Sequence, residues 1–216
     1  MSKKRYERCF MALNESQKQY LVDIHSAVEK RLSSRRFFHV KGVVDTAQKF
    51  AKRYGVDEFS AIAAAYLHDW DKEHSNEELI ELVKEYKLGD FSESELKEYY
   101  PLLHAWTGAF SALMEFPELP TSVFVAISKH TTAAKDMSDL DKIIYCADML
   151  EPSRGVKSLD KIAAKSKKLT LDELYSTCFK HSMKYLLKHD KQIYPPSIDI
   201  WNELIRERNA DCKQKR

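Results

Sequence analysis

Hydrophobic residues recur at helical spacing along most of the chain. In the segment 15–33, Leu21, Ile24, Val28 and Leu32 share one face, because steps of three and four residues are close to one helical turn. Caps, prolines and glycines divide this pattern into separate segments. Helices are predicted over 15–33, 43–54, 57–67, 76–88, 122–129, 139–150, 171–189 and 198–208, and another begins at Pro101. The pattern therefore predicts a series of helices and no strand.

The composition favours the same fold class. The chain has 216 residues, with only 5 glycines and 6 prolines, whereas turn-rich β proteins usually need more of both. At about 150 residues per domain, the length fits one domain. We therefore expect an all-α protein with a single helical bundle. Its expected organisation is an N-terminal extension (1–16), the bundle (17–209) and a C-terminal tail (210–216).

Net charge and hydropathy argue against a nucleic-acid polymer or a membrane as the partner of this protein. The 35 basic and 33 acidic side chains leave a net charge of +2, which gives no reason to expect a nucleic-acid polymer. No apolar run approaches the roughly 20 residues of a membrane span, and residues 1–16 lack the apolar core of a signal peptide. The four cysteines are scattered, as expected for reduced thiols. We predict a soluble, cytoplasmic protein without a membrane partner.

Four of the eight histidines and two aspartates are candidate ligands of a metal ion. They are His39, His68, Asp69, His104, His130 and Asp148. The histidines lie at or near predicted helix ends, and Asp148 lies within an apolar helix, where an unpaired acid is costly. Imidazole and carboxylate ligands suit iron, manganese or zinc, and a set without cysteine can keep a position open for water. The set therefore predicts metal-assisted hydrolysis, provided that the chain bends at 70–72 so that His68 and Asp69 converge.

Longer motifs surround these residues. They include RFFHVKGV at 36–43, AAYLHD at 64–69, HTT at 130–132 and ADMLEPSR at 147–154. With them, the chain resembles the HD-domain phosphohydrolases over 33–209, and more narrowly the bacterial YqeK family of symmetrical diadenosine tetraphosphate hydrolases. Two positions depart from that family: Ala133 stands where a glycine is frequent, and Tyr194 stands where a histidine is expected.

The resemblance implies a role for each matching residue. The metal ligands would be His39, His68, Asp69 and Asp148, and the catalytic residues Asp69, Lys72, His104 and His130. The substrate contacts would come from Arg36, His39, Asp69, Trp70, Asp71, Lys72, His104, His130, Arg154, Tyr194 and Ser197. The expected cofactor is a divalent metal, with iron favoured over manganese or another transition metal, bound as one or two ions.

The resemblance also implies the reaction. The substrate would be a dinucleoside polyphosphate, above all diadenosine tetraphosphate, which a metal-activated water would cleave into two ADP. A homodimer is compatible with this reading. Two alternatives stay open: another HD-type nucleotide phosphohydrolase or phosphatase, and a nucleotide- and metal-binding regulatory protein with little turnover. A purely structural helical adaptor leaves Asp148 unexplained.

Overall fold

The fold is described by a computed structural model that covers residues 13–214, with side chains for 13–210. Across this part of the chain every regular element is helical, which confirms the all-α prediction. The α-helices are α1 (Glu15–Arg31), α2 (Ser34–Tyr54), α3 (Glu58–Leu67), α4 (Asn76–Tyr86), α5 (Glu93–Glu98), α6 (Tyr100–Glu115), α7 (Thr121–Lys129), α8 (Asp139–Leu150), α9 (Lys157–Lys165), α10 (Leu171–Lys188) and α11 (Pro195–Gln214). Two 3-10 turns are η1 (Pro152–Arg154) and η2 (Ser166–Lys168).

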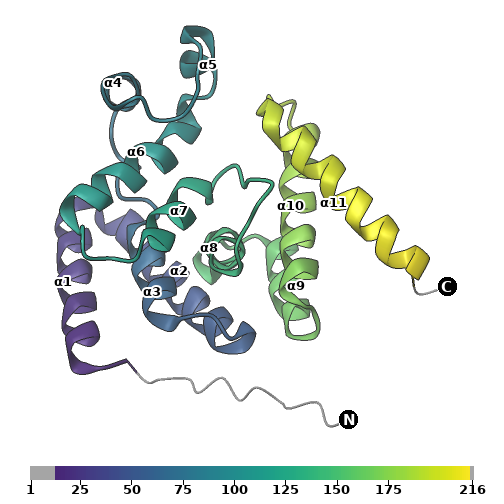
Figure 1. Ribbon diagram of the computed structural model, residues 1–216, viewed down its shortest axis with the longest axis horizontal. Coiled ribbons are helices and arrows are strands. Elements are labelled where there is room, and N and C mark those ends of the chain that lie inside the picture. Colours follow the sequence, from purple (N-terminus) through teal and green to yellow (C-terminus); the bar gives the residue numbers. More distant parts are fainter. Residues whose placement is uncertain (1–12, 215–216) are drawn as a thin grey trace.

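Helix α8 lies at the centre of the bundle and is seen end-on in Figure 1. Helices α2, α3 and α7 pack against it on one side, and α10 packs on another. Its inward face carries Ile143, Ile144 and Ala147, all fully buried, which meet apolar residues such as Val43 of α2 and Ile127 of α7 in one core. This arrangement brings the ends of helices distant in sequence to a common point.

Local sequence signals explain where the main helices begin and end. Ser33 caps α2 by accepting a bond from the backbone of Arg36, and Gly55 ends it in the left-handed conformation (φ 74°), as the sequence predicts. Ser138 and Asp141 form a capping box that starts α8. The predicted helix over 139–150 has the same bounds in the structure.

Several predicted bounds were wrong. Helix α2 begins at residue 34 rather than 43, and α5 and α9 lie where the sequence analysis placed no helix. Helix α7 begins at Thr121 rather than at residue 122, and Pro120 occupies the cap position. Helix α11 begins at Pro195 rather than at residue 198, because proline is well tolerated at the start of a helix.

The ends of the chain are described only in part. Of the predicted extension, residues 1–12 lie outside the described residues, and α1 begins at Glu15. At the other end, α11 runs to Gln214, through most of the predicted tail.

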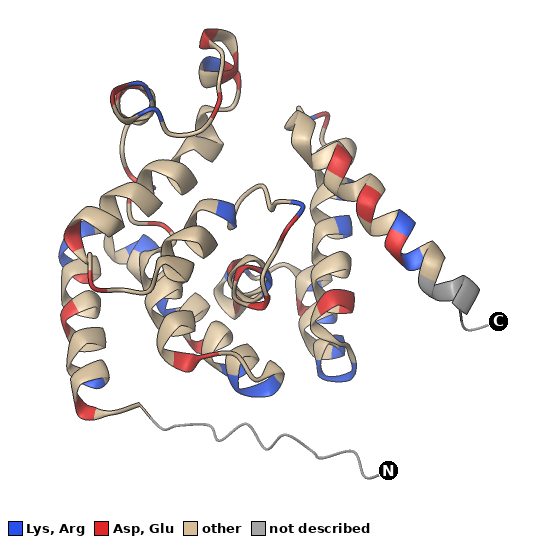
Figure 2. Cartoon of the chain, in the orientation of Figure 1, with Lys and Arg blue, Asp and Glu red and all other residues tan. Residues whose placement is uncertain are grey.

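None of the helices in the described part combines the length and hydropathy that a membrane crossing requires. Figure 2 shows basic and acidic positions interspersed along α11. The charged residues of this helix include Glu203, Arg206 and Glu207. Cys146 and Cys178 are free and buried in the core.

Candidate functional site

Four histidines converge on the carboxylate of Asp69. His39 lies in α2, His68 follows α3, His104 lies near the start of α6, and His130 follows α7. The Nε2 atom of each imidazole lies 3.3–3.8 Å from an oxygen of Asp69. The fold therefore assembles, around one carboxylate, residues that span about ninety positions of the sequence.

The two oxygens of Asp69 face different pairs of histidines. Oδ2 lies 3.7 Å from His39 Nε2 and 3.3 Å from His68 Nε2. Oδ1 lies 3.4 Å from His104 Nε2 and 3.8 Å from His130 Nε2. Each pair forms, with Asp69, a group whose ligand atoms all lie within 4.8 Å of one another. A carboxylate placed in this way can serve one ion or bridge two.

A sharp turn after α3 lets neighbouring residues point at the same place. The backbone N–H of Trp70 donates to the Leu67 carbonyl, and that of Lys72 donates to the Asp69 carbonyl. These short-range bonds turn the chain away from the helix axis, so that His68 Nε2 and Asp69 Oδ2 come within 3.3 Å. The bend expected at 70–72 is confirmed.

Hydrogen bonds at Nδ1 fix the orientation of the imidazoles. Three histidines use the carbonyl three residues earlier: His68 contacts Ala65 O at 2.7 Å, His104 contacts Pro101 O at 2.9 Å, and His130 contacts Ile127 O at 2.7 Å. A carbonyl oxygen only accepts, so Nδ1 carries the hydrogen in each bond. In the neutral imidazole this leaves a lone pair on Nε2, directed at the cluster.

The Nε2 atoms are short of partners within the protein. Those of His39 and His68 are buried without a hydrogen bond among the described residues. Those of His104 and His130 face each other at 3.2 Å, where two lone pairs repel unless a cation lies close by. Buried acceptors without donors, combined with a central carboxylate, fit a divalent metal of the iron, manganese or zinc type.

Asp148 completes the predicted ligand set. Its Oδ1 lies 3.0 Å from His39 Nε2 and 3.7 Å from His68 Nε2. The side chain is 22% exposed and is held by Arg154, whose Nη2 lies 2.5 Å from the same oxygen and whose Nε donates to the Asp148 carbonyl. All four predicted metal ligands therefore lie together.

Opposing influences set the pKa values in the cluster. Burial lowers the pKa of His68, but the charges of Asp69 and Asp148 outweigh burial and raise this pKa to about 10. Burial, with the charges of His104 and His68, lowers the pKa of His130 to about 3. Burial also lowers the pKa of His104. The His68 side of the cluster thus favours a cation, and the His130 side favours neutral imidazole.

Three basic side chains surround the cluster, as predicted. Arg36 Nη1 lies 2.9 Å from Asp69 Oδ2, and Lys72 Nζ lies 3.4 Å from the ring nitrogens of His104. Burial lowers the pKa of Lys72. With Arg154 on Asp148, these cations lie where they can also meet an anionic ligand of the cluster.

Trp70 and Asp71 lie on the reverse side of the turn. Arg31 lies over the Trp70 ring at 4.6 Å, and Phe116 contacts the same ring edge-on. The fully buried Asp71 carboxylate lies 2.8 Å from Arg31 and accepts a 2.8 Å bond from Ser111. The contacts of these two predicted substrate residues thus fix the turn rather than line the cluster.

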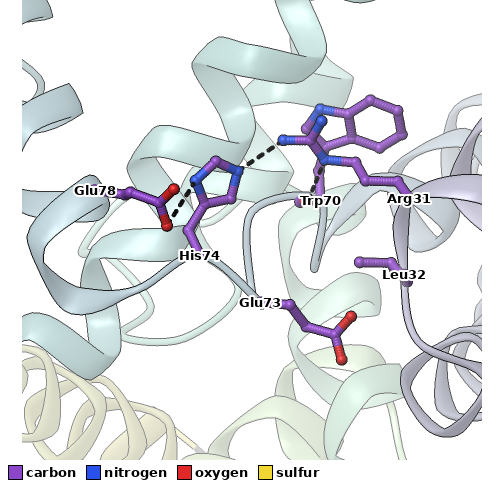
Figure 3. A pocket seen from close by; sticks show the side chains of 6 residues that line it. All are labelled: Arg31, Leu32, Trp70, Glu73, His74 and Glu78. Atoms are coloured by element: carbon purple, nitrogen blue, oxygen red, sulfur yellow. Dashed lines mark hydrogen bonds and ion pairs between the residues drawn. The ribbon is translucent and has the colours of Figure 1, made fainter.

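Figure 3 shows the pocket on this reverse side. Arg31 lies over Trp70 and reaches His74, with its Nη2 2.9 Å from His74 Nε2, while His74 Nδ1 lies 3.8 Å from Glu78. Leu32 and Glu73 complete the lining. None of the six lining residues belongs to the histidine cluster, so the pocket is distinct from it.

Tyr194 belongs to an aromatic group between α11 and the α5–α6 region. Its ring centroid lies 5.3 Å from that of Tyr99 and 6.2 Å from those of Phe91 and Trp106. Ser197 is buried in the first turn of α11. The ring contacts of Tyr194 are therefore with this group and not with the histidines.

One residue close to the cluster received no role from the sequence. Glu151, at the end of α8, is buried and lies 2.9 Å from Nδ1 of His39. An acid at a helix C-terminus opposes the helix dipole, and this is the signal that could have singled it out. Ala133 also stands out, since its φ of 61° is a conformation that glycine adopts more readily.

Comparisons with known proteins agree with this geometry. Residues 36–153 match the model of the HD domain. The symmetrical bis(5'-nucleosyl)-tetraphosphatase of Halalkalibacterium halodurans is 34% identical over 181 residues, covering 83% of this chain and 94% of the relative. The Bacillus subtilis enzyme of the same name is 29% identical over 83% of this chain and 95% of the relative.

A solved structure is also similar. It is described as a predicted HD superfamily hydrolase involved in NAD metabolism, from Clostridium acetobutylicum. The two chains are 28% identical, with a TM-score of 0.78, and the match covers 86% of this chain and 97% of the other.

Proposed function

Because this chain belongs to the HD-domain family and, within it, to the symmetrical bis(5'-nucleosyl)-tetraphosphatases, we propose that its histidine–aspartate cluster is the metal centre of that reaction. The protein is a hydrolase of phosphoric anhydrides that cleaves diadenosine tetraphosphate. Symmetrical cleavage of this substrate yields two molecules of ADP. The proposal concerns which residues perform the reaction and how.

The convergence of four Nε2 atoms on Asp69 carries the proposal. Three of the imidazoles are oriented by carbonyls of their own segments, so their Nε2 atoms point at the cluster before any ligand binds. A structural histidine normally finds a hydrogen-bond partner for each ring nitrogen, whereas Nε2 of His39 and of His68 has none among the described residues. This preorganisation supports an ion-binding role over a purely structural one.

The first ion would be held by His39, His68, Asp69 and Asp148. A divalent ion bound there supplies a water of lowered pKa, which is a nucleophile near neutral pH. Arg154 holds the Asp148 carboxylate in place, and Arg36 does the same for Asp69. In the complex with substrate, Arg36, Lys72 and Arg154 would contact phosphate oxygens, where Arg offers a bidentate fork and Lys a compact charge.

His104 and His130 would act on the Oδ1 side of Asp69. Their neutral imidazoles can accept a proton, bind a second ion or, once protonated, donate to a phosphoryl oxygen whose charge grows during cleavage. Lys72, in contact with His104, would stabilise the same growing charge. We propose iron as the metal, with manganese as the alternative, and one or two ions per chain.

Metal stoichiometry should distinguish a centre with one bound ion from a centre with two. We expect protein purified without oxygen and loaded with ferrous iron to hold two ions, because each oxygen of Asp69 faces its own histidine pair. The measurement is metal content by elemental analysis, with the His104→Ala/His130→Ala double variant beside the wild type. The variant should lose one ion and keep the other; loss of neither would show that this pair binds no ion.

Product analysis tests the reaction itself. The metal-loaded protein, incubated with diadenosine tetraphosphate and separated by chromatography, should yield ADP as the only nucleotide product. Formation of ATP with AMP would place the attack at an outer phosphate and contradict symmetrical cleavage. Intact substrate at full metal content, with a nucleoside monophosphate or another nucleotide cleaved instead, would favour the alternative of a different HD-type phosphohydrolase.

The remaining sequence predictions stay predictions. Substrate contacts at Trp70, Asp71, Tyr194 and Ser197 would require these side chains to reach parts of the substrate beyond the cluster. The homodimer and the cytoplasmic location are likewise proposed, the location on the basis of the reduced, buried cysteines.

A further inference from the structure

We propose that Glu151 is a positioning residue that orients His39 and strengthens it as a metal ligand. This inference rests on the proposed function, because it presupposes that His39 binds the ion. Glu151 itself contacts Nδ1, on the side of the ring away from the Nε2 atom that faces Asp69. It therefore acts through His39 and not on the ion.

The contact with Glu151 shows which ring nitrogen of His39 carries the hydrogen. Glu151 Oε1 lies 2.9 Å from Nδ1, and Glu151 as a whole is 2% exposed. An ionised carboxylate only accepts hydrogen bonds, so Nδ1 donates and the neutral ring keeps its lone pair on Nε2. His39 thereby adopts the same tautomer as the other three histidines. It differs from them because its Nδ1 partner is a side chain that is 112 residues away in the sequence.

The surroundings hold the carboxylate in this position. Ser153 donates its backbone N–H to Oε2 at 2.6 Å and its hydroxyl to Oε1 at 2.7 Å. Gly42 lies one helical turn after His39, and a Cβ atom there would lie 2.5 Å from Oε2 of Glu151. The absence of a side chain at Gly42 is thus what lets the carboxylate approach α2.

One helix end therefore holds both edges of the His39 ring. Asp148 lies 3.0 Å from Nε2 and Glu151 lies 2.9 Å from Nδ1, and the two acids are three residues apart around the end of α8. A carboxylate behind a metal-binding histidine fixes the ring and raises its basicity, and loss of such a partner typically weakens metal binding about 10–100-fold. We expect an effect of this size here.

Cobalt binding to the otherwise intact, metal-free protein measures the effect without relying on activity. Co²⁺ binds nitrogen and oxygen sites more tightly than Mn²⁺ does, and its visible spectrum reports the ligands. Affinities from chelator competition should fall roughly 10–100-fold in Glu151→Ala. The loss should be smaller in Glu151→Gln, which keeps an acceptor but loses the charge. Gly42→Ala should weaken binding in the same direction, because its methyl group displaces the carboxylate.

A matched control and a double-variant cycle separate positioning from general damage to the fold. Asp141→Asn likewise removes a buried negative charge, here from the first turn of α8, where Asp141 pairs with Lys129 at 3.0 Å, and it should leave cobalt affinity unchanged. In a His39→Ala background, Glu151→Ala should cost no further affinity, because the two residues act as one unit.

The outcomes are distinct for the two proposals. If wild-type protein binds no cobalt, the proposed metal centre fails, and this inference fails with it. If wild-type protein binds cobalt and Glu151→Ala binds it equally well, the inference alone is overturned. An undiminished effect of Glu151→Ala in the His39→Ala background would also overturn it, since Glu151 would then act by another route.

Discussion

Asp69→Asn should bind no stoichiometric metal and should hydrolyse diadenosine tetraphosphate at least roughly a thousandfold more slowly than the wild type. Metal assistance is worth several kcal/mol of transition-state stabilisation, and each 1.4 kcal/mol is a tenfold change in rate. Asp69 is the carboxylate that all four Nε2 atoms share, so its loss weakens both halves of the cluster. Asparagine keeps the size of the side chain and removes only the charge and one acceptor.

The measurement is metal content together with single-turnover hydrolysis, with circular dichroism to verify the fold. Asp71→Asn is the matched control, since it makes the same change two positions along the same turn, at a residue that faces Arg31. The control should retain its metal. Wild-type metal content and rate in Asp69→Asn would contradict the assignment of the cluster as the metal centre.

Asp71→Ala should lower the free energy of unfolding by about 3 kcal/mol. The substitution leaves Arg31 and Ser111 without their buried acceptor, and breaking a buried ion pair typically costs about 3–5 kcal/mol. We expect the lower end of that range because the Arg31 side chain is 34% exposed. For a chain of this size, the thermal midpoint should fall by about 6–12 °C.

Thermal and urea unfolding of the metal-free protein measure this loss without interference from metal binding. The Arg31→Ala/Asp71→Ala double variant should be less destabilised than the sum of the single variants, because the two residues share one interaction. Strict additivity, or a loss below about 1 kcal/mol, would mean that this pair does not hold the turn.

The helices were predictable where the apolar pattern and the caps agree. In α8, a capping box precedes a strongly apolar run, and the predicted bounds match those observed. The start of α2 was predicted too late because the charged Arg35 and Arg36 interrupt the apolar spacing in its first turn. The short α5 was missed for its polar composition, although Ser92 and Glu95 form a capping box at its start.

The composition of the site could be predicted from the sequence, but its geometry could not. Motifs identified the four histidines and the two aspartates, yet no spacing reveals that the two oxygens of Asp69 serve different histidine pairs. Trp70 and Asp71 follow Asp69 directly, but successive residues of a turn point in different directions, so their contacts lie on the reverse side. The contact between His39 and Glu151 is invisible in the sequence, because only the packing of α2 on α8 creates it.

The partners of the four imidazoles have a consequence for heritable variation. A backbone carbonyl is present whatever residue a codon specifies, so the bonds that orient His68, His104 and His130 survive point substitution of the residues that supply them. The bond that orients His39 depends on the genetic identity of two positions, 42 and 151. Among the positions that orient the four imidazoles, these two codons are therefore where natural variation should most disturb a ring of the cluster.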